Sequence, residues 1–138
     1  MEEAWNSWDR LEPVNRLLWF FAGALGYGLL ELFWRGYTHW SMLVAGGICL
    51  IGINFLDEAL PGLKDRAKVW LCCLLITGTE LGMGLIFNCL GGQQVWDYSE
   101  LPYNFLGQIC LQYSLLWLLL SRPLLYFVRW LRPGITKI

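Results

Sequence analysis

The sequence predicts an all-α integral membrane protein, a single domain with four transmembrane helices. Four apolar runs are each long enough to cross a bilayer, which takes ~20 helical residues. Hydrophobic residues make up 57% of the 138-residue chain and charged residues only 15%. Soluble domains carry about 25% charged residues, so the composition argues against an ordinary soluble fold.

The four spans are expected over residues 14–34, 38–56, 67–90 and 103–121. The chain ends are rich in tryptophan and arginine, the make-up of segments that lie along the lipid headgroup layer. Pro123 is expected to end or kink the fourth span. The first residues lack a basic region and a small-residue cleavage site, so we expect the first span to be retained.

Basic residues gather on one side of these spans. Nine of the ten Lys and Arg residues lie before or at the start of span one, between spans two and three or at the start of span three, or after span four, and Arg35 alone lies on the other side. Cytoplasmic segments of membrane proteins collect Lys and Arg. The distribution predicts that both termini and the middle loop are cytoplasmic, with the protein in the cell membrane.

The two halves of the chain echo each other. The run GGICL at residues 46–50 is matched by GQICL at residues 107–111, and Glu31 and Glu80 stand in corresponding places in the preceding spans. This pattern predicts two helical hairpins related as parallel repeats, an arrangement in which transporters often bind substrate between the halves. A chance match between short apolar segments is the alternative.

Glu31 and Glu80 are the most informative single residues, because each is a carboxylate inside an apolar span. A charged side chain at that depth costs several kcal/mol unless it is protonated, paired or facing a wet cavity. If Glu80 is buried, we expect it to take up and release protons near neutral pH. The structural alternative for Glu31 is an ion pair with Arg35, one helical turn later.

Further polar residues fall on stripes of the first, third and fourth spans and in the two outer loops, which are expected to form a polar lid. Such stripes either line a pocket or bond helices together. Asp97 has three open roles: capping the next helix, pairing with Arg35, or contacting a ligand. The candidate residues for binding a substrate or ion are Glu31, Arg35, Glu80, Asn88, Asp97, Asn104 and Gln108, supported by His39, Trp40, Trp96, Tyr98, Ser99 and Gln112.

Several function classes find no support in the sequence. A net charge of −1 gives no argument for nucleic acid. The five cysteines form no CxxC and the one histidine has no partner at metal spacing, so we expect neither a metal nor another cofactor. No serine or cysteine is visibly paired with His39, so we expect no enzyme. The phosphate-binding pattern GxxxxGK[ST] is absent, so any ATPase would be a separate partner.

The run VWDYS at residues 95–99 begins a longer pattern that includes Pro102, Asn104, GQICL at 107–111 and SLLW at 114–117, with Glu80 and Asn88 ahead of it. This pattern resembles the putative ABC-transporter type IV membrane proteins, also called CmpB-like, which include the small transmembrane protein 229 type members. The resemblance covers nearly the whole four-span region. It implies a multispan membrane fold and a link to transport.

The leading functional hypothesis is a small transport or channel-like protein, with a carboxylate site that opens to the outer face. Four short helices enclose little volume, so we expect a homo-oligomer in the lipid bilayer, with a substrate path between subunits. The alternative is a non-transporting subunit that binds lipid or a partner membrane protein. A buried contact surface would produce similar polar stripes.

Overall fold

A computed structural model describes residues 13–137, and it is helical apart from one short hairpin and the connecting loops. The elements in chain order are α2 (Pro13–Arg35), α3 (Trp40–Ala59), α4 (Asp65–Gly84), the π-helix η1 (Leu85–Leu90), β1 (Asn104–Phe105), β2 (Ile109–Cys110) and α5 (Leu111–Thr136). Because η1 continues α4, the described chain has four helical segments long and apolar enough to cross a membrane. The prediction of four helices with the length and composition of membrane spans is confirmed.

Local chemistry explains where the first helices begin and end. Pro13 occupies the first position of α2, where its fixed φ suits a helix and its missing N–H costs nothing. Gly36 follows the last residue of α2 with a φ of +77°, and its N–H donates to the Leu32 carbonyl at 3.0 Å. This left-handed residue closes the helix in the way glycine commonly does. α3 then begins after His39, whose Nδ1 accepts from the Ser41 N–H at 3.3 Å.

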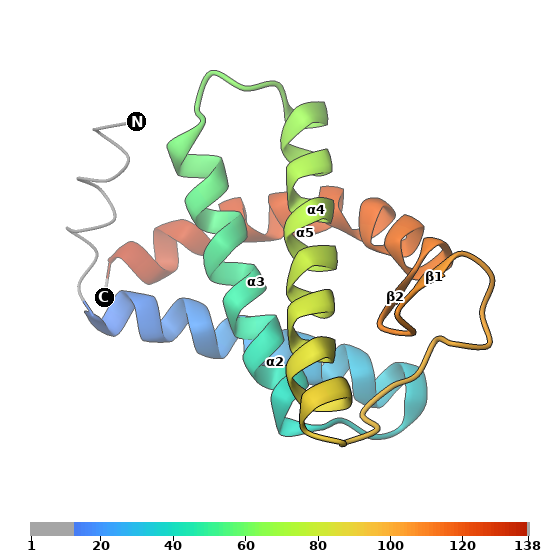
Figure 1. The fold of residues 1–138 in the computed structure, drawn as a ribbon. Coiled ribbons are helices and arrows are strands. Elements are labelled where there is room, and N and C mark those ends of the chain that lie inside the picture. The colour runs from blue at the N-terminus through green and yellow to red at the C-terminus, as the bar shows by residue number, and fades with distance from the viewer. Residues whose placement is uncertain (1–12, 138) are drawn as a thin grey trace.

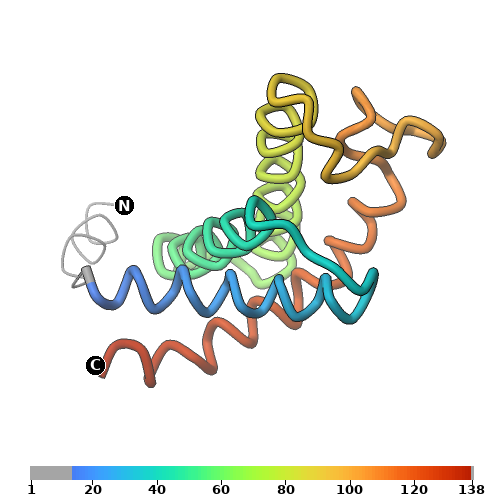
Figure 2. Tube along the Cα trace, turned by 90° about the horizontal axis from the view of Figure 1, so that it is seen from below, coloured from blue at the N-terminus to red at the C-terminus, as the bar shows by residue number. Residues whose placement is uncertain are grey.

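The four helices cross one another obliquely. α3 and α4 run as neighbours in opposite directions, and α2 and α5 lie together on one side of that pair (Figure 1, Figure 2). The end of α5 comes back close to the start of α2 in both views. The loops at 36–39 and 91–103 lie away from these two ends. This arrangement is compatible with termini on one side of a membrane, and their cytoplasmic location stays a prediction.

Glycines bring α2 and α3 into close contact. A Cβ added to Gly23 would lie 2.3 Å from the Gly46 carbonyl oxygen, and one added to Gly46 would lie 2.4 Å from Tyr27 Cβ. Neither position can hold a larger residue without separating the helices. Small residues of this kind allow close helix packing in membranes, where no hydrophobic effect drives helices together.

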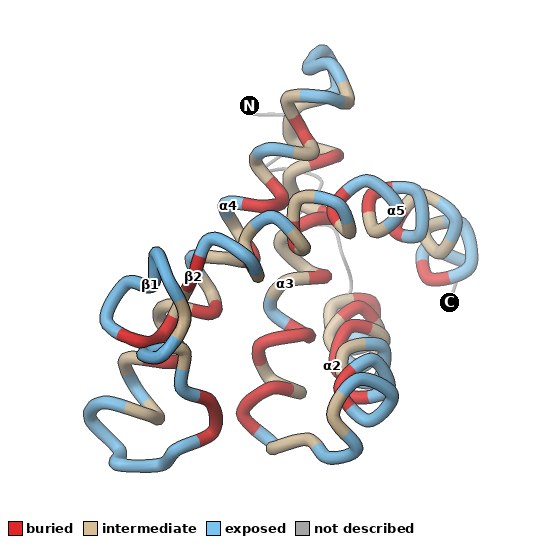
Figure 3. Tube along the Cα trace, turned by 90° about the vertical axis from the view of Figure 1, so that its right-hand side faces the viewer, coloured by how far each residue is buried: buried red, intermediate tan, exposed pale blue. Residues whose placement is uncertain are grey.

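The outward faces of the helices are strongly apolar. Leu25, Leu29, Leu119 and Trp130 are each more than 60% exposed, while buried residues face the interior (Figure 3). Soluble proteins rarely expose so much contiguous apolar surface. The exposed faces are suited to contact with lipid, which agrees with four membrane-spanning helices.

The prediction for the fourth span was wrong at both ends. Residues 103–110 form the β1–β2 hairpin, where Tyr103, Leu106 and Gly107 have positive φ values that a helix does not allow. α5 starts at Leu111 and continues past Pro123 to Thr136. Membrane helices tolerate proline where neighbouring groups compensate for the lost hydrogen bond, and Leu125 and Val128 beyond it are fully buried.

The hairpin also bears on the predicted repeat. Residues 46–50 lie inside α3, whereas the matching residues 107–111 form a turn, β2 and the first position of α5. The two similar sequences therefore adopt different structures. The similarity does not mark equivalent positions, and the prediction of two parallel hairpin repeats is not confirmed.

Candidate functional site

Glu80 lies near the end of α4 and is 6% exposed. The Tyr98 hydroxyl donates to its Oε1 at 2.9 Å, and Trp117 Nε1 donates to its Oε2 at 3.1 Å. No ion pair between residues 13 and 137 includes Glu80. Two neutral donors therefore hold the carboxylate, and it could gain a proton without breaking a salt bridge.

Tyr98 belongs to the loop that follows η1, and its ring stacks on Tyr113 of α5 with 4.7 Å between centroids. Burial and the nearby Glu80 carboxylate raise the pKa of the Tyr98 hydroxyl above its usual range. The phenol is therefore protonated at any physiological pH. It can act as a donor to Glu80, or as an acceptor after its O–H rotates.

Glu31 and Arg35 lie one turn apart at the end of α2 and form an ion pair. The Arg35 guanidinium also donates from Nη1 to the Val95 carbonyl at 3.1 Å and lies 4.5 Å from the centroid of the Tyr37 ring. Its Nη2 atom is buried without a hydrogen-bond partner among the described residues. Arg35 thus links α2 to the long loop and keeps one free donor.

The chain between η1 and α5, residues 91–110, folds over this end of the helices, and we call it the lid. Asn88 in η1 anchors it twice, donating to Gln108 Oε1 and accepting from the Val95 N–H, each at 2.8 Å. Trp96 Nε1 donates to the Gln108 carbonyl at 2.9 Å. Irregular π-turns often occur at functional sites, and here one places Asn88 under the lid.

Other predicted site residues hold the lid in shape. Asp97 Oδ1 accepts from the Ser99 N–H at 2.9 Å, which lowers the pKa of Asp97. Asn104 donates to the Ser99 and Leu101 carbonyls and accepts from the Gly107 N–H. Since α5 starts at Leu111, Asp97 does not cap that helix. These bonds stay inside the exposed part of the lid.

Three supporting residues lie outside the group around Glu80. His39 is the N-cap of α3, and its Nδ1 is 2.7 Å from Ser41 Oγ. Trp40 is exposed and packs edge-on against Phe87. Gln112 is exposed at the start of α5. Within residues 13–137, no three His, Cys, Asp or Glu side chains are placed to hold a metal ion.

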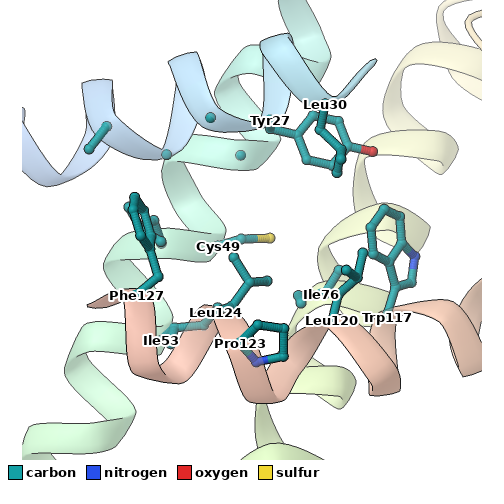
Figure 4. A pocket seen from close by; sticks show the side chains of 15 residues that line it. Tyr27, Leu30, Cys49, Ile53, Ile76, Trp117, Leu120, Pro123, Leu124 and Phe127 are labelled. Atoms are coloured by element: carbon teal, nitrogen blue, oxygen red, sulfur yellow. The ribbon is translucent and has the colours of Figure 1, made fainter. Parts of the chain in front are cut away.

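Two adjoining cavities lie between α2 and α5. The first, of about 310 Å³, has an almost wholly apolar wall contributed by all four helices (Figure 4). The second, of about 270 Å³, is lined by Glu31, Arg35, Tyr98 and Trp96 together with apolar residues. Both are bordered by Tyr27, Leu30, Trp117 and Leu120. Glu80 lies behind Tyr98 and Trp117, the two residues of the second cavity that donate to it.

A second polar cluster, at the far ends of α3, α4 and α5, was missed by the sequence analysis, and we call it the Asp57 network. Asp57 is 7% exposed and accepts from Lys68 Nζ at 2.7 Å, while Arg129 and Arg132 each donate to it at 2.7–2.8 Å. Asn54, Glu58 and Asp65 bond to the two arginines at its edge. The sequence signal available for this cluster was the spacing of three residues between polar or charged side chains on each of these helices, Asn54 and Asp57, Asp65 and Lys68, and Arg129 and Arg132.

Comparison with known families matches residues 2–138 to the family described as "putative ABC-transporter type IV". The chain belongs to this family. No solved structure matches it. The match covers essentially the whole chain, and the four apolar helices agree with an integral membrane component of a transporter family. Within this family member, the lid motif WDYS at residues 96–99 supplies the hydroxyl that holds Glu80.

Proposed function

We propose that this chain is a small membrane transport protein in which Glu80 is the proton-binding group of a site that opens toward the lid. The observation that carries the proposal is the Glu80 carboxylate, buried beside a cavity and held by two neutral donors rather than by a cation. Ionisable groups inside membrane spans commonly belong to proton or ion pathways. The basic-residue distribution supports a position of the lid on the outer face.

The two donors define where a proton would sit. Trp117 Nε1 can only donate, so Oε2 must remain an acceptor. The Tyr98 hydroxyl can rotate and accept instead, so Oε1 can carry a proton without leaving two donors facing each other. Tyr98 also lines the second cavity. Proton exchange between the cavity and Glu80 would therefore pass through the Tyr98 side.

Other titratable groups lie near Glu80. Glu31 on α2 interacts with it electrostatically, and Tyr98 faces it from the lid. Tyr27 on α2 and Cys49 on α3 lie close enough to be affected by the Glu80 charge. Glu31 is a carboxylate like Glu80, and Arg35 compensates its negative charge. Occupancy of the second cavity near that ion pair would change the field at Glu80. This change would couple the binding of substrate in the cavity to the binding of a proton by Glu80.

The proposal needs no catalytic activity from the chain itself. With no phosphate-binding loop in the sequence, ATP hydrolysis in an ABC-type assembly would come from a separate chain. We also propose that copies of this chain associate, because the two cavities of one copy measure only about 310 and 270 Å³. A path between subunits would supply the missing volume.

The test is proton flux in liposomes that contain the purified protein and an internal pH-sensitive dye. We expect Glu80→Gln to abolish flux driven by a pH gradient, and Tyr98→Phe to reduce it strongly. The matched control is Glu100→Gln, which makes the same change on an exposed lid residue and should leave flux intact. Equal flux in wild type and Glu80→Gln would reject the carboxylate site. Absence of flux in wild type, with a stoichiometric protein partner in native mass spectra, would favour the partner-binding subunit.

A further inference from the structure

We infer that the seam between α2 and α5 binds a single-chain amphiphile with a carboxylate head, such as a long-chain fatty acid. The hydrocarbon chain would occupy the apolar first cavity and the head the second cavity, near Arg35. This inference names the substrate class of the transport protein and so rests on the proposed function. Its evidence is nevertheless separate from Glu80, since it comes from the shape and polarity of the seam.

The seam has the polarity gradient of such a molecule. Figure 4 shows the first cavity between α2 and α5, with Leu30 and Tyr27 on one side and Pro123, Leu124 and Phe127 on the other. The second cavity continues past Leu30 and Leu120 toward Arg35, the last residue of α2. Arg35 therefore ends a helix long and apolar enough to span a membrane, and in a spanning helix this end would meet the lipid headgroups.

Arg35 supplies the head-group chemistry. Its Nε and Nη1 atoms are engaged by Glu31 and the Val95 carbonyl, while its Nη2 atom is buried and unpartnered among the described residues. A buried guanidinium donor without a partner favours an acceptor oxygen from a ligand. A singly charged carboxylate suits the position better than a phosphate, because the Glu31 carboxylate lies on the same guanidinium.

The dimensions of the two cavities suit a hydrocarbon chain. The cavities measure about 310 and 270 Å³, close to the ~300 Å³ at which small-molecule sites begin. Tyr27, Leu30, Trp117 and Leu120 border both of them, so one extended chain could occupy the two together.

The residues along the seam also allow entry from the membrane. Leu30, Phe33 and Trp34 line the second cavity and are among the exposed large hydrophobic residues. Phe127 lines the first cavity and is also exposed. A chain could thus enter sideways from the lipid, without crossing the lid.

Gly26 allows a direct test, because it lines the first cavity and a Cβ there would meet nothing within 4 Å. Gly26→Phe should fill the seam without a clash. Gly78 on α4 is the matched control, since it is an exposed helical glycine with equally open surroundings and lines neither cavity. Comparing Gly26→Phe with Gly78→Phe separates a filled seam from a general effect of phenylalanine in a helix.

The probe is a fatty acid with a diazirine in its chain, irradiated with the full-length protein in nanodiscs. We expect labelled peptides from α2 and α5, competition by oleate but not by lysophosphatidylcholine, and a loss of labelling of at least about tenfold in Gly26→Phe alone. Arg35→Gln should remove the preference for oleate over the corresponding alcohol. Labelling that persists in Gly26→Phe, or equal competition by lysophosphatidylcholine, would overturn the inference.

The same measurement distinguishes this inference from the proposed function. Glu80→Gln should keep the label on the same peptides of α2 and α5, because Glu80 lies behind the cavity wall formed by Tyr98 and Trp117. Coupling between Glu80 and the cavity would change only the amount of label. Labelling in wild type without proton flux would support the binding site and reject the proton-coupled transport. Flux that depends on Glu80 without labelling of the seam would reject the amphiphile and keep the transport proposal.

Discussion

The Asp57 network and the group around Glu80 place buried carboxylates at opposite ends of the same helices, but their partners differ in kind. Asp57 has a lysine and two arginines as partners, whereas Glu80 has a tyrosine and a tryptophan. Cations stabilise a carboxylate in its charged form, while neutral donors leave it free to gain a proton. The first arrangement is suited to holding helices together and the second to changing state.

The surroundings of the two carboxylates differ in the same sense. The Asp57 network joins α3, α4 and α5 through charged side chains, and Lys68 within it is only 4% exposed. Glu80 instead lies beside two cavities and under a lid whose own bonds are mostly local. Motion at the lid end therefore costs fewer strong interactions than motion at the Asp57 end. If the protein changes conformation, we therefore expect the change at the lid end.

The largest expected effect tests the Asp57 end. Asp57→Ala would leave Lys68, Arg129 and Arg132 without their shared carboxylate, and breaking a buried ion pair costs ~3–5 kcal/mol. We expect a loss of that size in thermal unfolding of the protein in detergent. The control is Asp65→Ala, because the Asp65 side chain is 44% exposed and contacts Arg129 at the edge of the network. A much smaller cost is expected there, because exposed ion pairs contribute little to stability. Equal losses in both variants would contradict the contrast.

An intermediate effect is expected at Arg35, which joins α2 to the lid. Arg35→Gln would remove the bond to the Val95 carbonyl and the ion pair with Glu31, at a cost of about 1–3 kcal/mol for hydrogen bonds of a charged group. Hydrogen exchange should quicken at lid amides, residues 91–110, and stay unchanged in α3 and α4. Arg122→Gln, on an exposed turn of α5, should change neither. Faster exchange throughout α3 and α4 would show that Arg35 stabilises the whole fold.

The sequence identified the group around Glu80 far better than the Asp57 network. Glu31 and Glu80 stand out in the sequence because each is a carboxylate inside an apolar span with no lysine or arginine directly alongside. Glu31, Arg35, Trp96 and Tyr98 do line one cavity, with Glu80 directly behind it. Glu31, Arg35 and Glu80 occupy helical positions, which periodicity can place, whereas Trp96 and Tyr98 belong to the lid loop.

The Asp57 network could not be found in the same way. Lys68, Arg129 and Arg132 were interpreted as markers of the cytoplasmic side, a role that needs no specific partner. Their common acceptor comes from another helix, 11 residues from Lys68 and 72 from Arg129. Such pairings depend on how helices pack against one another, and the periodicity of a single segment does not predict this packing. The β1–β2 hairpin was missed for a related reason, since apolar residues at positive φ are not signalled by their type.

The smallest expected change in stability is at Glu80, and it sharpens the comparison most. In Glu80→Gln the amide oxygen can still accept from either Trp117 or Tyr98, and no buried cation is left uncompensated. We expect unfolding free energy to change by less than ~1.5 kcal/mol, the net value of one neutral hydrogen bond. Thermal unfolding beside Asp57→Ala, in the same detergent, measures the difference. A loss at Glu80 as large as at Asp57 would mean that this carboxylate also serves to hold the helices, and the flux lost in Glu80→Gln would then report a damaged fold. A small loss together with abolished flux would instead assign Glu80 to the transport cycle, since the variant keeps the fold and lacks only the group that exchanges a proton.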